Sequence, residues 1–467
     1  MKSDQKRRSF LKKGLLGGLG FYGVSSGADS AGGVEYDAIP GFAGSAAKGK
    51  SVIDLKVDPI KQVKVALIGI GSRGTGHVSQ FASLFPDKAA VVAVCDIQKE
   101  RAEKGVSILE KKGQKATPYF GKIDSWKEMV KRDDIDLVVI ATPWRDHVPM
   151  AVYAMQQGKH VVIEVPAAMT LAECWQLVDT AEETQRNCMM MENVCYGDEE
   201  LWLLNMVQNN VFGTLTYAEA AYIHNLADAL LDKNGYYEFW RLKENIAHDG
   251  NLYPMHGLGP VAQYLDILRG DRFEQIVSMS SLEASLSEKI KGLPGDHPYA
   301  SFKGKINHGD MNTSLIKTNK GRMITLKHDV VTPRPYDRIN ALAGTHAFHQ
   351  GYPSRLSLLD KGHDFLKEAD YNEYKSKYKH PIWDKLKKEI ELNGGHGGMD
   401  FVLVYRIIDC LNKGVPMDMD VYDAATWCSV IPLSEVSVSK GSSAVKFPDF
   451  TRGRWNEKRA LGIMKPL

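Results

Sequence analysis

The stretch Val63–Gly76, which reads VKVALIGIGSRGTG, constrains the fold more than any other segment of the chain. Its opening apolar run predicts a buried parallel strand, and the spacing Gly69-x-Gly71-x-x-Gly74 predicts a tight turn into a helix. A turn of this kind brings the backbone close to a pyrophosphate, and the helix N-terminus then presents free N–H groups to that phosphate.

An acidic residue follows at the distance that a dinucleotide-binding fold requires. The apolar run Ala89–Cys95 ends at Asp96, 22 residues after Gly74. A carboxylate at this position hydrogen-bonds the ribose hydroxyls and repels a 2′-phosphate, so NAD rather than NADP is the expected cofactor. The alternative interpretation is a strand-to-helix turn that binds no phosphate and has an exposed aspartate.

Strands and helices alternate through the first half of the chain, which predicts an α/β domain with a parallel, doubly wound sheet. Because ligands of such sheets bind beyond the carboxyl ends of the strands, the loops at Trp144–His147 and Glu164–Pro166 should face the cofactor. For Trp144 and His147 the alternative is packing over the sheet edge. The expected strands are Val63–Ile70, Ala89–Cys95, Leu137–Thr142, His160–Glu164 and Cys188–Met191, and the expected helices are Gly74–Leu84, Lys99–Lys112, Ser125–Lys131, Val148–Gln157 and Leu171–Thr184.

From about residue 197 the strands cluster without helices between them, which predicts a second α/β domain built on an open, mostly antiparallel sheet. The sequence leaves the oligomeric state open, although an open sheet face favours pairing with a second copy of the chain to form a homo-oligomer. The expected boundaries are a linker or extended arm (31–60), a Rossmann domain (61–195), a substrate-binding domain (196–445) and a polar surface tail (446–467). The expected elements are strands Thr214–Tyr222, Gln275–Ser280, Met311–Thr318, Met323–Asp329 and Ile339–Ala343, helices Asp198–Asn209, Asp400–Asn412 and Val421–Lys440, and a charged helical or irregular stretch Leu358–Ile390.

The charge balance argues against a nucleic-acid partner. The 467 residues carry 59 Lys and Arg against 57 Asp and Glu, so no basic field is available. The six cysteines show neither a CxxC pair nor zinc-ligand spacing, which predicts free buried thiols and no metal site. A small-molecule or glycan substrate is therefore expected.

The N-terminus predicts export. The run Lys6–Lys13 contains adjacent Arg7 and Arg8, then Ser-Phe-Leu, and precedes a short, glycine-rich apolar stretch. This pattern resembles a twin-arginine signal over residues 1–30, read by the twin-arginine export machinery, and implies a periplasmic protein. The apolar stretch is too short and too rich in glycine to span a membrane, so no integral membrane segment is expected. A disordered basic tail is the alternative.

The Rossmann motif and the second-domain pattern resemble the glucose–fructose oxidoreductase and inositol dehydrogenase superfamily. Those enzymes usually carry Glu-Lys-Pro at the end of a Rossmann strand, whereas this chain has Glu164-Val165-Pro166. The lysine that assists proton transfer in the sugar dehydrogenases is therefore missing. This departure counts against a simple sugar dehydrogenase.

A longer set of motifs, spread over residues 61–455, resembles glycoside hydrolase family 109, which contains NAD-dependent α-N-acetylgalactosaminidases. The motifs are Met191–Gly197, Tyr222–His224, Trp240-Arg241, Asn251–Pro260, Arg334–Tyr336, Gly395–Asp400 and Asp420–Trp427. The resemblance implies that Ser72, Arg73, Asp96, Trp144, Arg145, Asp146, His147, Glu164, Val165, Asn193 and Tyr253 hold NAD together with the three motif glycines. It also implies a sugar site made by Tyr222, Arg241, Tyr253, Pro254, Met255, His256 and Tyr336, with Glu192 close by.

The family mechanism, carried over, is redox-neutral hydrolysis of a terminal N-acetylgalactosaminide or related hexoside. The sugar is oxidised at C3, deprotonated at C2, opened by elimination of the glycosidic oxygen, hydrated and reduced again. His256 is the expected acceptor of the hydroxyl proton because imidazole titrates near neutrality. Tyr222 is a candidate C2 base if Arg241 lowers its pKa, and Tyr253 could share a proton with His256 or with the leaving oxygen.

Structural roles remain as alternatives for these residues: core packing for Tyr222, a surface ion pair for Arg241 and a helix cap for His256. His396 either reaches the site or only shapes its glycine-rich turn. For the whole protein, an exported NAD site favours a cofactor that is reduced and reoxidised in one cycle, since free NAD is scarce outside the cytoplasm. Besides the glycosidase, a sugar oxidoreductase of the glucose–fructose type and a non-catalytic NAD-holding sugar-binding protein satisfy this condition.

Overall fold

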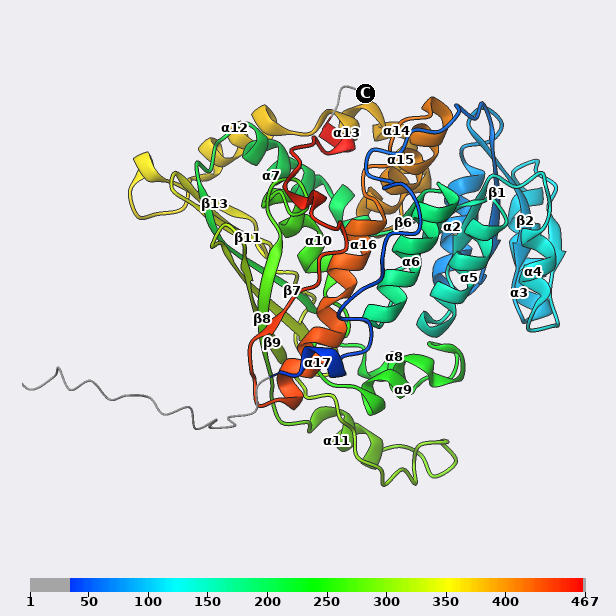
Figure 1. The fold of residues 1–467 in the computed structure, drawn as a ribbon, viewed down its shortest axis with the longest axis horizontal. Coiled ribbons are helices and arrows are strands. Elements are labelled where there is room, and N and C mark those ends of the chain that lie inside the picture. The colour runs from blue at the N-terminus through cyan, green and yellow to red at the C-terminus, as the bar shows by residue number, and fades with distance from the viewer. Residues whose placement is uncertain (1–33, 465–467) are drawn as a thin grey trace, which may run out of the picture. The chain divides into compact units, whose positions relative to one another are not determined.

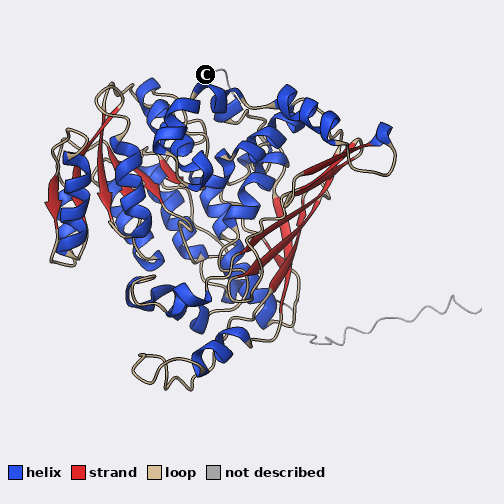
Figure 2. Ribbon diagram, turned by 180° about the vertical axis from the view of Figure 1, so that it is seen from behind, coloured by secondary structure: helices blue, strands red, loops and turns tan. Residues whose placement is uncertain are grey.

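The computed structural model describes residues 34–464. The expected twin-arginine signal lies outside the described residues. Two sheets stand on either side of a layer of helices in which α6, α10 and α16 contact one another or the sheets (Figures 1 and 2). The cofactor and substrate residues discussed below come from the elements where these layers meet.

The first sheet is parallel throughout, with strand order β3-β2-β1-β4-β5-β6. This is the doubly wound order of dinucleotide-binding domains, and it confirms the predicted parallel sheet. The strands are β1 (Val63–Ile68), β2 (Ala89–Cys95), β3 (Thr117–Tyr119), β4 (Leu137–Ile140), β5 (His160–Ile163) and β6 (Cys188–Met190), and the helices are α2 (Ser72–Ala82), α3 (Lys99–Glu110), α4 (Ser125–Val130), α5 (Trp144–Gln156) and α6 (Leu171–Thr184).

Apolar runs explain the central strands of this sheet, because β4 and β5 are buried along their whole length. The edge strand β3 was not predicted, since Thr117–Tyr119 is short and largely accessible. The segment Trp144–His147, expected as a loop, forms the first turn of α5 after Pro143. Proline suits the position that precedes a helix because its missing N–H would have no helical partner there.

The second sheet has the order β13-β12-β11-β7-β10-β9-β8-β14. Only β7 and β10 pair in parallel, so the predicted open, mostly antiparallel sheet is confirmed. Short β12, β13 and β14 were not predicted, and the boundary expected at residue 445 falls inside β14. The strands are β7 (Leu215–Ile223), β8 (Phe273–Ser280), β9 (Asn312–Thr318), β10 (Met323–Asp329), β11 (Ala341–Gly344), β12 (Ala347–Gln350), β13 (Arg355–Leu358) and β14 (Val445–Lys446).

Helices cover one face of this sheet: α10 packs on β7, and α17 packs on β8. The single helix expected over Val421–Lys440 is two helices, α16 and α17, because Pro432 near the start of α17 has no N–H with which to continue the ladder of α16. The helices are α7 (Asp198–Gln208), α8 (Ala227–Leu231), α9 (Trp240–Ala247), α10 (Met255–Tyr264), α11 (Ser285–Lys291), α12 (Glu368–Tyr378), α13 (Pro381–Lys385), α14 (Lys387–Asn393), α15 (Met399–Lys413), α16 (Val421–Cys428) and α17 (Val430–Ser439).

Short 3₁₀ turns complete the described chain, and two of them, η2 and η5, carry residues of the site. They are η1 (Tyr36–Ala38), η2 (Asn193–Tyr196), η3 (Tyr237–Phe239), η4 (Leu359–Lys361), η5 (His396–Gly398), η6 (Arg454–Asn456) and η7 (Gly462–Met464).

Both ends of the described chain are held against the body. Residues 34–60 follow an extended path in which Val52 and Ile53 are buried and Ile60 N–H donates to Leu411 O at 3.0 Å. Beyond β14, Phe450 and Ile463 are also buried. The polar tail expected after residue 446 is therefore anchored by apolar side chains.

Candidate functional site

The glycine-rich turn after β1 forms a phosphate-sized cradle. A side chain at Gly74 would bring its Cβ to 1.8 Å from Gly69 O, so the turn can close only with glycine at position 74. Helix α2 begins directly after Gly71, and its first N–H groups have no helical carbonyl to bond. These groups suit the pyrophosphate of a dinucleotide.

Asp96 stands at the end of β2, where a ribose would lie. Its Oδ2 accepts from Ile70 N–H at 2.7 Å and its Oδ1 from Gln98 N–H at 2.9 Å, which fixes the carboxylate against the glycine turn. A carboxylate has about four acceptor positions, so capacity remains for ribose hydroxyls. The cradle and Asp96 together fit NAD.

The four residues expected to contact the cofactor lie in the first turn of α5, and their surroundings differ. Trp144 is buried against Trp240 and Tyr253, with ring centroids 4.8 and 5.9 Å away, which ties the NAD-binding half to the second domain. His147 is fully buried, and its ring nitrogens lie 2.8 Å from Thr142 O and Pro166 O. The His147 ring is thus occupied in joining two strand-end loops. Arg145 is largely exposed beside Asp146.

A charged cluster joins the end of β5 to the start of α15. The Arg73 guanidinium donates to Glu164 at 2.8 Å and to Asp400 at 2.8 Å, while His77 Nε2 lies 2.6 Å from Glu164. Burial opposes the charge on both acids, but Arg73 and the neighbouring histidines overcome it and hold the pKa of each carboxyl well below its usual range. Both carboxylates are therefore ionised at neutral pH.

Asp400 also positions two residues that face the cavity. Its Oδ2 lies 2.7 Å from His396 Nδ1, and its Oδ1 accepts from the Asn193 amide at 2.6 Å. The Asn193 Oδ1 is buried and has no partner among residues 34–464, so one amide acceptor is left for a ligand. His396, whose role the sequence left open, lines the cavity.

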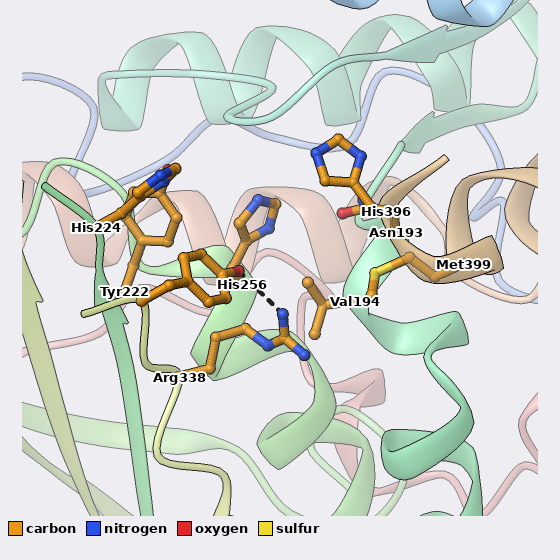
Figure 3. Close-up of a pocket in the computed structure, with 9 residues that line it drawn as sticks. Asn193, Val194, Tyr222, His224, His256, Arg338, His396 and Met399 are labelled. Carbon is orange, nitrogen blue, oxygen red and sulfur yellow. Dashed lines mark hydrogen bonds between the residues drawn. The ribbon is translucent and has the colours of Figure 1, made fainter. Parts of the chain in front are cut away.

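A cavity of about 270 Å³ lies between the second sheet and these strand ends. Figure 3 shows Tyr222 and His224 on one side of it, His396, Asn193 and Met399 on the other, and His256 between them. It is lined by Asn193, Val194, Tyr222, His224, His256, Tyr336, Arg338, His396 and Met399.

His256 forms a pair with a buried carboxylate. Its Nδ1 lies 2.8 and 3.0 Å from the two oxygens of Glu192, whose side chain has no exposed surface. When Nδ1–H donates to Glu192, Nε2 keeps a lone pair that can accept a proton.

Two glycines on α10 permit this approach. A Cβ at Gly257 would lie 2.5 Å from Ala221 N on β7, and a Cβ at Gly259 would lie 3.0 Å from the Glu192 side chain. The sequence His256-Gly-Leu-Gly therefore lets the helix pack closely against both the strand and the carboxylate.

Arg241 is buried inside a cage of four aromatic rings rather than paired at the surface. Its guanidinium carbon lies 4.8 Å from the Tyr253 ring centroid and 5.2 to 5.9 Å from those of Trp144, Tyr222 and Tyr236. Nη1 donates to Tyr236 OH at 3.0 Å, and Nη2 has no partner among the described residues. Arg241 thus places a permanent positive charge behind Tyr222.

From the sequence, Tyr222 is a candidate base if Arg241 lowers its pKa. In the structure, Arg241 does not lower the pKa of Tyr222 below its usual value. Burial raises the pKa of Tyr222 to about 12, and the opposing effect of Arg241 is too small to reverse it. The phenol is protonated at neutral pH and lies 3.1 Å from His224 Nδ1. Burial, with help from Arg241, lowers the pKa of His224, so its ring is neutral at neutral pH and can accept a hydrogen bond from the Tyr222 hydroxyl.

Of the predicted sugar-site residues, Tyr222, His256 and Tyr336 line the cavity, while Glu192, Arg241 and Tyr253 stand directly behind it. Tyr253 stacks on Trp144, and burial raises its pKa well above the usual value. Pro254 is the N-cap of α10. Met255 is fully buried and packs in the core, so its side chain does not line the cavity.

Sequence reasoning missed His224 and Arg338. Each lies two residues after a predicted tyrosine, Tyr222 and Tyr336, and alternate residues of an extended chain share a face. That spacing was the available signal. Arg338 is held by Glu200 and by Tyr336 OH, both at 2.9 Å.

Within residues 34–464, no group of three or more His, Cys, Asp or Glu is arranged to hold a metal ion. No helix within 34–464 combines the length and apolar character needed to cross a membrane.

Solved structures resemble this one in fold. Levoglucosan dehydrogenase in complex with NADH superposes with a TM-score of 0.62 at 16% identity, covering 83% of this chain and all of the other. The scyllo-inositol dehydrogenase of Lactobacillus casei gives a TM-score of 0.57 at 13% identity, covering 83% and 98%.

Sequence comparison is more specific. Residues 63–192 match the oxidoreductase family with an NAD-binding Rossmann fold, and residues 196–457 match the C-terminal domain of glycosyl hydrolase 109. The α-N-acetylgalactosaminidase of Shewanella oneidensis is 47% identical over 89% of this chain and 91% of its own length. A family 109 protein of Shewanella baltica is 46% identical over 98% of each chain. With its NAD cradle joined to a histidine- and tyrosine-lined cavity, the chain belongs to glycosyl hydrolase family 109.

Proposed function

We propose that the protein hydrolyses terminal α-N-acetylgalactosaminides by an NAD-dependent, redox-neutral route. The name of the Shewanella oneidensis relative supports the substrate class. The observation that carries the mechanism is the convergence of Tyr222, His256 and His396 on one cavity, each with its own orienting partner. Three separate proton transfers are what oxidation, elimination and hydration of a sugar require.

In this proposal, NAD accounts for the oxidation and reduction of the sugar, and protein side chains account for cofactor binding and proton transfer. Bound NAD would supply the reversible oxidation of the sugar at C3, which acidifies the C2 proton. Ser72 and the N–H groups of α2, with Asp96, would hold its pyrophosphate and ribose, and Asn193 Oδ1 offers an acceptor beside the cavity. Val165 adjoins Glu164 where the superfamily usually has lysine, so proton transfer depends on other side chains.

We assign the three proton transfers to separate groups. His256, held by Glu192, accepts the C3 hydroxyl proton through Nε2. Tyr222 exchanges the C2 proton while passing its own to His224, since a phenol with a pKa of about 12 is not ionised in advance. His396, oriented by Asp400, protonates the departing glycosidic oxygen.

The test is hydrolysis of p-nitrophenyl α-N-acetylgalactosaminide in D₂O without added NAD, with the released sugar examined by NMR. We expect deuterium at C2 and no net NADH. Cleavage without C2 exchange would mean direct displacement, and the role assigned to Tyr222 would be wrong. Oxidation of free sugar without cleavage of any glycoside would favour the sugar oxidoreductase instead.

We also propose that the protein acts in the periplasm after folding and loading NAD in the cytoplasm. The adjacent Arg7 and Arg8 before a weakly apolar stretch support this. A cofactor that is reoxidised in every cycle needs no external supply, which suits an exported enzyme.

A further inference from the structure

A second cavity, of about 500 Å³, adjoins the catalytic one. Arg338, His396 and Met399 line both cavities, so the two share a border rather than lying on separate faces. One wall of the second cavity is the start of α7, and the other is formed by α13 and α14. None of the predicted site residues accounts for it.

The wall from α13 and α14 carries a rigid aromatic ring and two free charges. Trp383 lies on α13, and Lys387, Ile390 and Glu391 share one face of α14. The indole N–H of Trp383 donates to Tyr196 O at 3.2 Å, which fixes the ring. Lys387 and Glu391 are exposed and have no ion-pair partner within the described part of the chain.

On the opposite wall, most of the charged side chains already form ion pairs with other residues. Glu199 is bonded by Lys375, and Glu200 by Arg338. Asp198 keeps one buried oxygen, Oδ1, without a partner among residues 34–464. The second cavity therefore offers the free carboxylate of Glu391, the free ammonium group of Lys387 and the aromatic face of Trp383, while the Asp198 carboxylate opposite them is paired with Lys375 at 3.2 Å.

We propose that this second cavity is the leaving-group subsite and binds a neutral pyranose ring, the sugar that precedes the cleaved residue in a glycan. The inference rests on the proposed function and names the substrate class of that site. Sugar hydroxyls donate to carboxylates and accept from ammonium groups, so they satisfy free groups of both signs. A lipid or aryl group would desolvate the same charges without replacing their hydrogen bonds.

The shared border sets the direction of the substrate. With the terminal sugar in the first cavity and the preceding pyranose in the second, the glycosidic bond spans the border that His396 and Arg338 line. The glycine-rich loop carrying His396 rests on the same wall, because a Cβ at Gly398 would meet Ile390 at 2.5 Å and Trp383 at 3.0 Å. The loop that carries His396 therefore packs directly on the wall of the second cavity.

The experiment compares kcat/KM for two substrates: p-nitrophenyl α-N-acetylgalactosaminide and a disaccharide with α-N-acetylgalactosamine on O3 of galactose. The test variant is Lys387→Ala/Glu391→Ala, and the matched control is Lys388→Ala/Glu389→Ala, which removes the same two charges from α14 outside the cavity. For the test variant we expect a loss of about tenfold or more on the disaccharide and a much smaller loss on the aryl glycoside. The control should retain both activities.

The subsite proposal would be overturned if Lys387→Ala/Glu391→Ala lost kcat/KM equally on both substrates, or lost none on the disaccharide. So would a selective loss on a threonine-linked glycopeptide, which would make the occupant a peptide. If the wild-type protein cleaves neither substrate, the proposed function fails independently. Saturation-transfer NMR with methyl α-D-galactoside then decides the subsite: binding that Lys387→Ala/Glu391→Ala abolishes supports it, and absence of binding overturns it.

Discussion

At the scale of single residues, burial governs the chemistry of this site more than formal charge does. Arg241 lies close to Tyr222, and its charge favours the phenolate, yet the loss of solvent around Tyr222 has the larger effect. Tyr222 is consequently a proton relay with His224 rather than a preformed base. Arg241, caged by aromatic rings, can still stabilise negative charge that develops during the reaction.

Replacing the relay hydroxyl tests this interpretation. We expect Tyr222→Phe to lower kcat on the aryl glycoside by about 10²- to 10⁴-fold while NAD stays bound, as measured by steady-state kinetics and by the cofactor content of the purified protein. Tyr217→Phe, on the same strand with its hydroxyl bonded to Thr325, is the matched control. A Tyr222→Phe variant with normal turnover would remove Tyr222 from the mechanism.

At the scale of elements, close backbone approach and a charged cluster position the site. Helix α2 meets its strand only because position 74 lacks a side chain, and α10 meets β7 through Gly257. The Arg73 cluster then joins α2, the end of β5 and the start of α15.

Two alanine substitutions on α2 separate packing from helix propensity. Gly74→Ala should lower the free energy of unfolding by about 1–3 kcal/mol or more and abolish NAD retention, because the new Cβ collides with Gly69 O. Gly76→Ala has open space and should raise that free energy by up to about 1 kcal/mol. Urea unfolding and cofactor content measure both. If Gly74→Ala and Gly76→Ala changed the free energy of unfolding and the cofactor content equally, the role of Gly74 in the glycine turn would be wrong.

The Arg73 cluster predicts a pH dependence of stability. In the folded protein, the pKa values of Glu164 and Asp400 lie below their usual values near 4. The two ionised carboxylates therefore contribute fully to the free energy of unfolding above about pH 4, and this contribution is lost as the pH falls through the folded pKa values. Arg73→Met should raise both folded pKa values and move the midpoint of acid unfolding to higher pH. At pH 7 it should cost about 1–3 kcal/mol, less than a fully buried pair because a third of Arg73 meets solvent.

Circular dichroism during acid titration measures that midpoint. Lys127→Met, which breaks the exposed pair with Asp124, is the control and should leave the midpoint unchanged. An unchanged midpoint in Arg73→Met would mean that the cluster contributes nothing to acid stability.

At the scale of the whole molecule, the glycine turn and Asp96 lie in the first half of the chain, whereas the cavity takes residues from both halves and lies at the carboxyl ends of the first sheet. Asn193 follows β6, whereas Tyr222 lies near the end of β7 in the other sheet. The site therefore exists only when both domains have folded, which is compatible with export by a machinery that accepts folded proteins.

Replacing the arginine pair tests export. Arg7→Lys/Arg8→Lys should retain active, NAD-loaded protein in the cytoplasm, measured by cell fractionation and activity. Lys12→Arg/Lys13→Arg, five residues further on, is the control and should leave the distribution unchanged. Equal periplasmic recovery of both variants would exclude the twin-arginine route.

The parts of this protein that depend on local chemistry could be predicted from the sequence. The strand Val63–Ile68, its glycine turn and the parallel sheet follow from apolar runs and from glycine spacing, which act over a few residues. The second domain's open, mostly antiparallel sheet was also predicted correctly, but its strands do not cluster without helices: α8, α9 and α10 lie between β7 and β8, and α11 lies between β8 and β9.

Features that depend on residues far apart in the chain could not be predicted and required the folded structure. His224 and Arg338 reach the cavity because their segments meet there, and Asp400 orients Asn193, which lies 207 residues earlier in the chain. The pKa of Tyr222 rose rather than fell because desolvation is set by everything packed around a group, not by its neighbours in sequence.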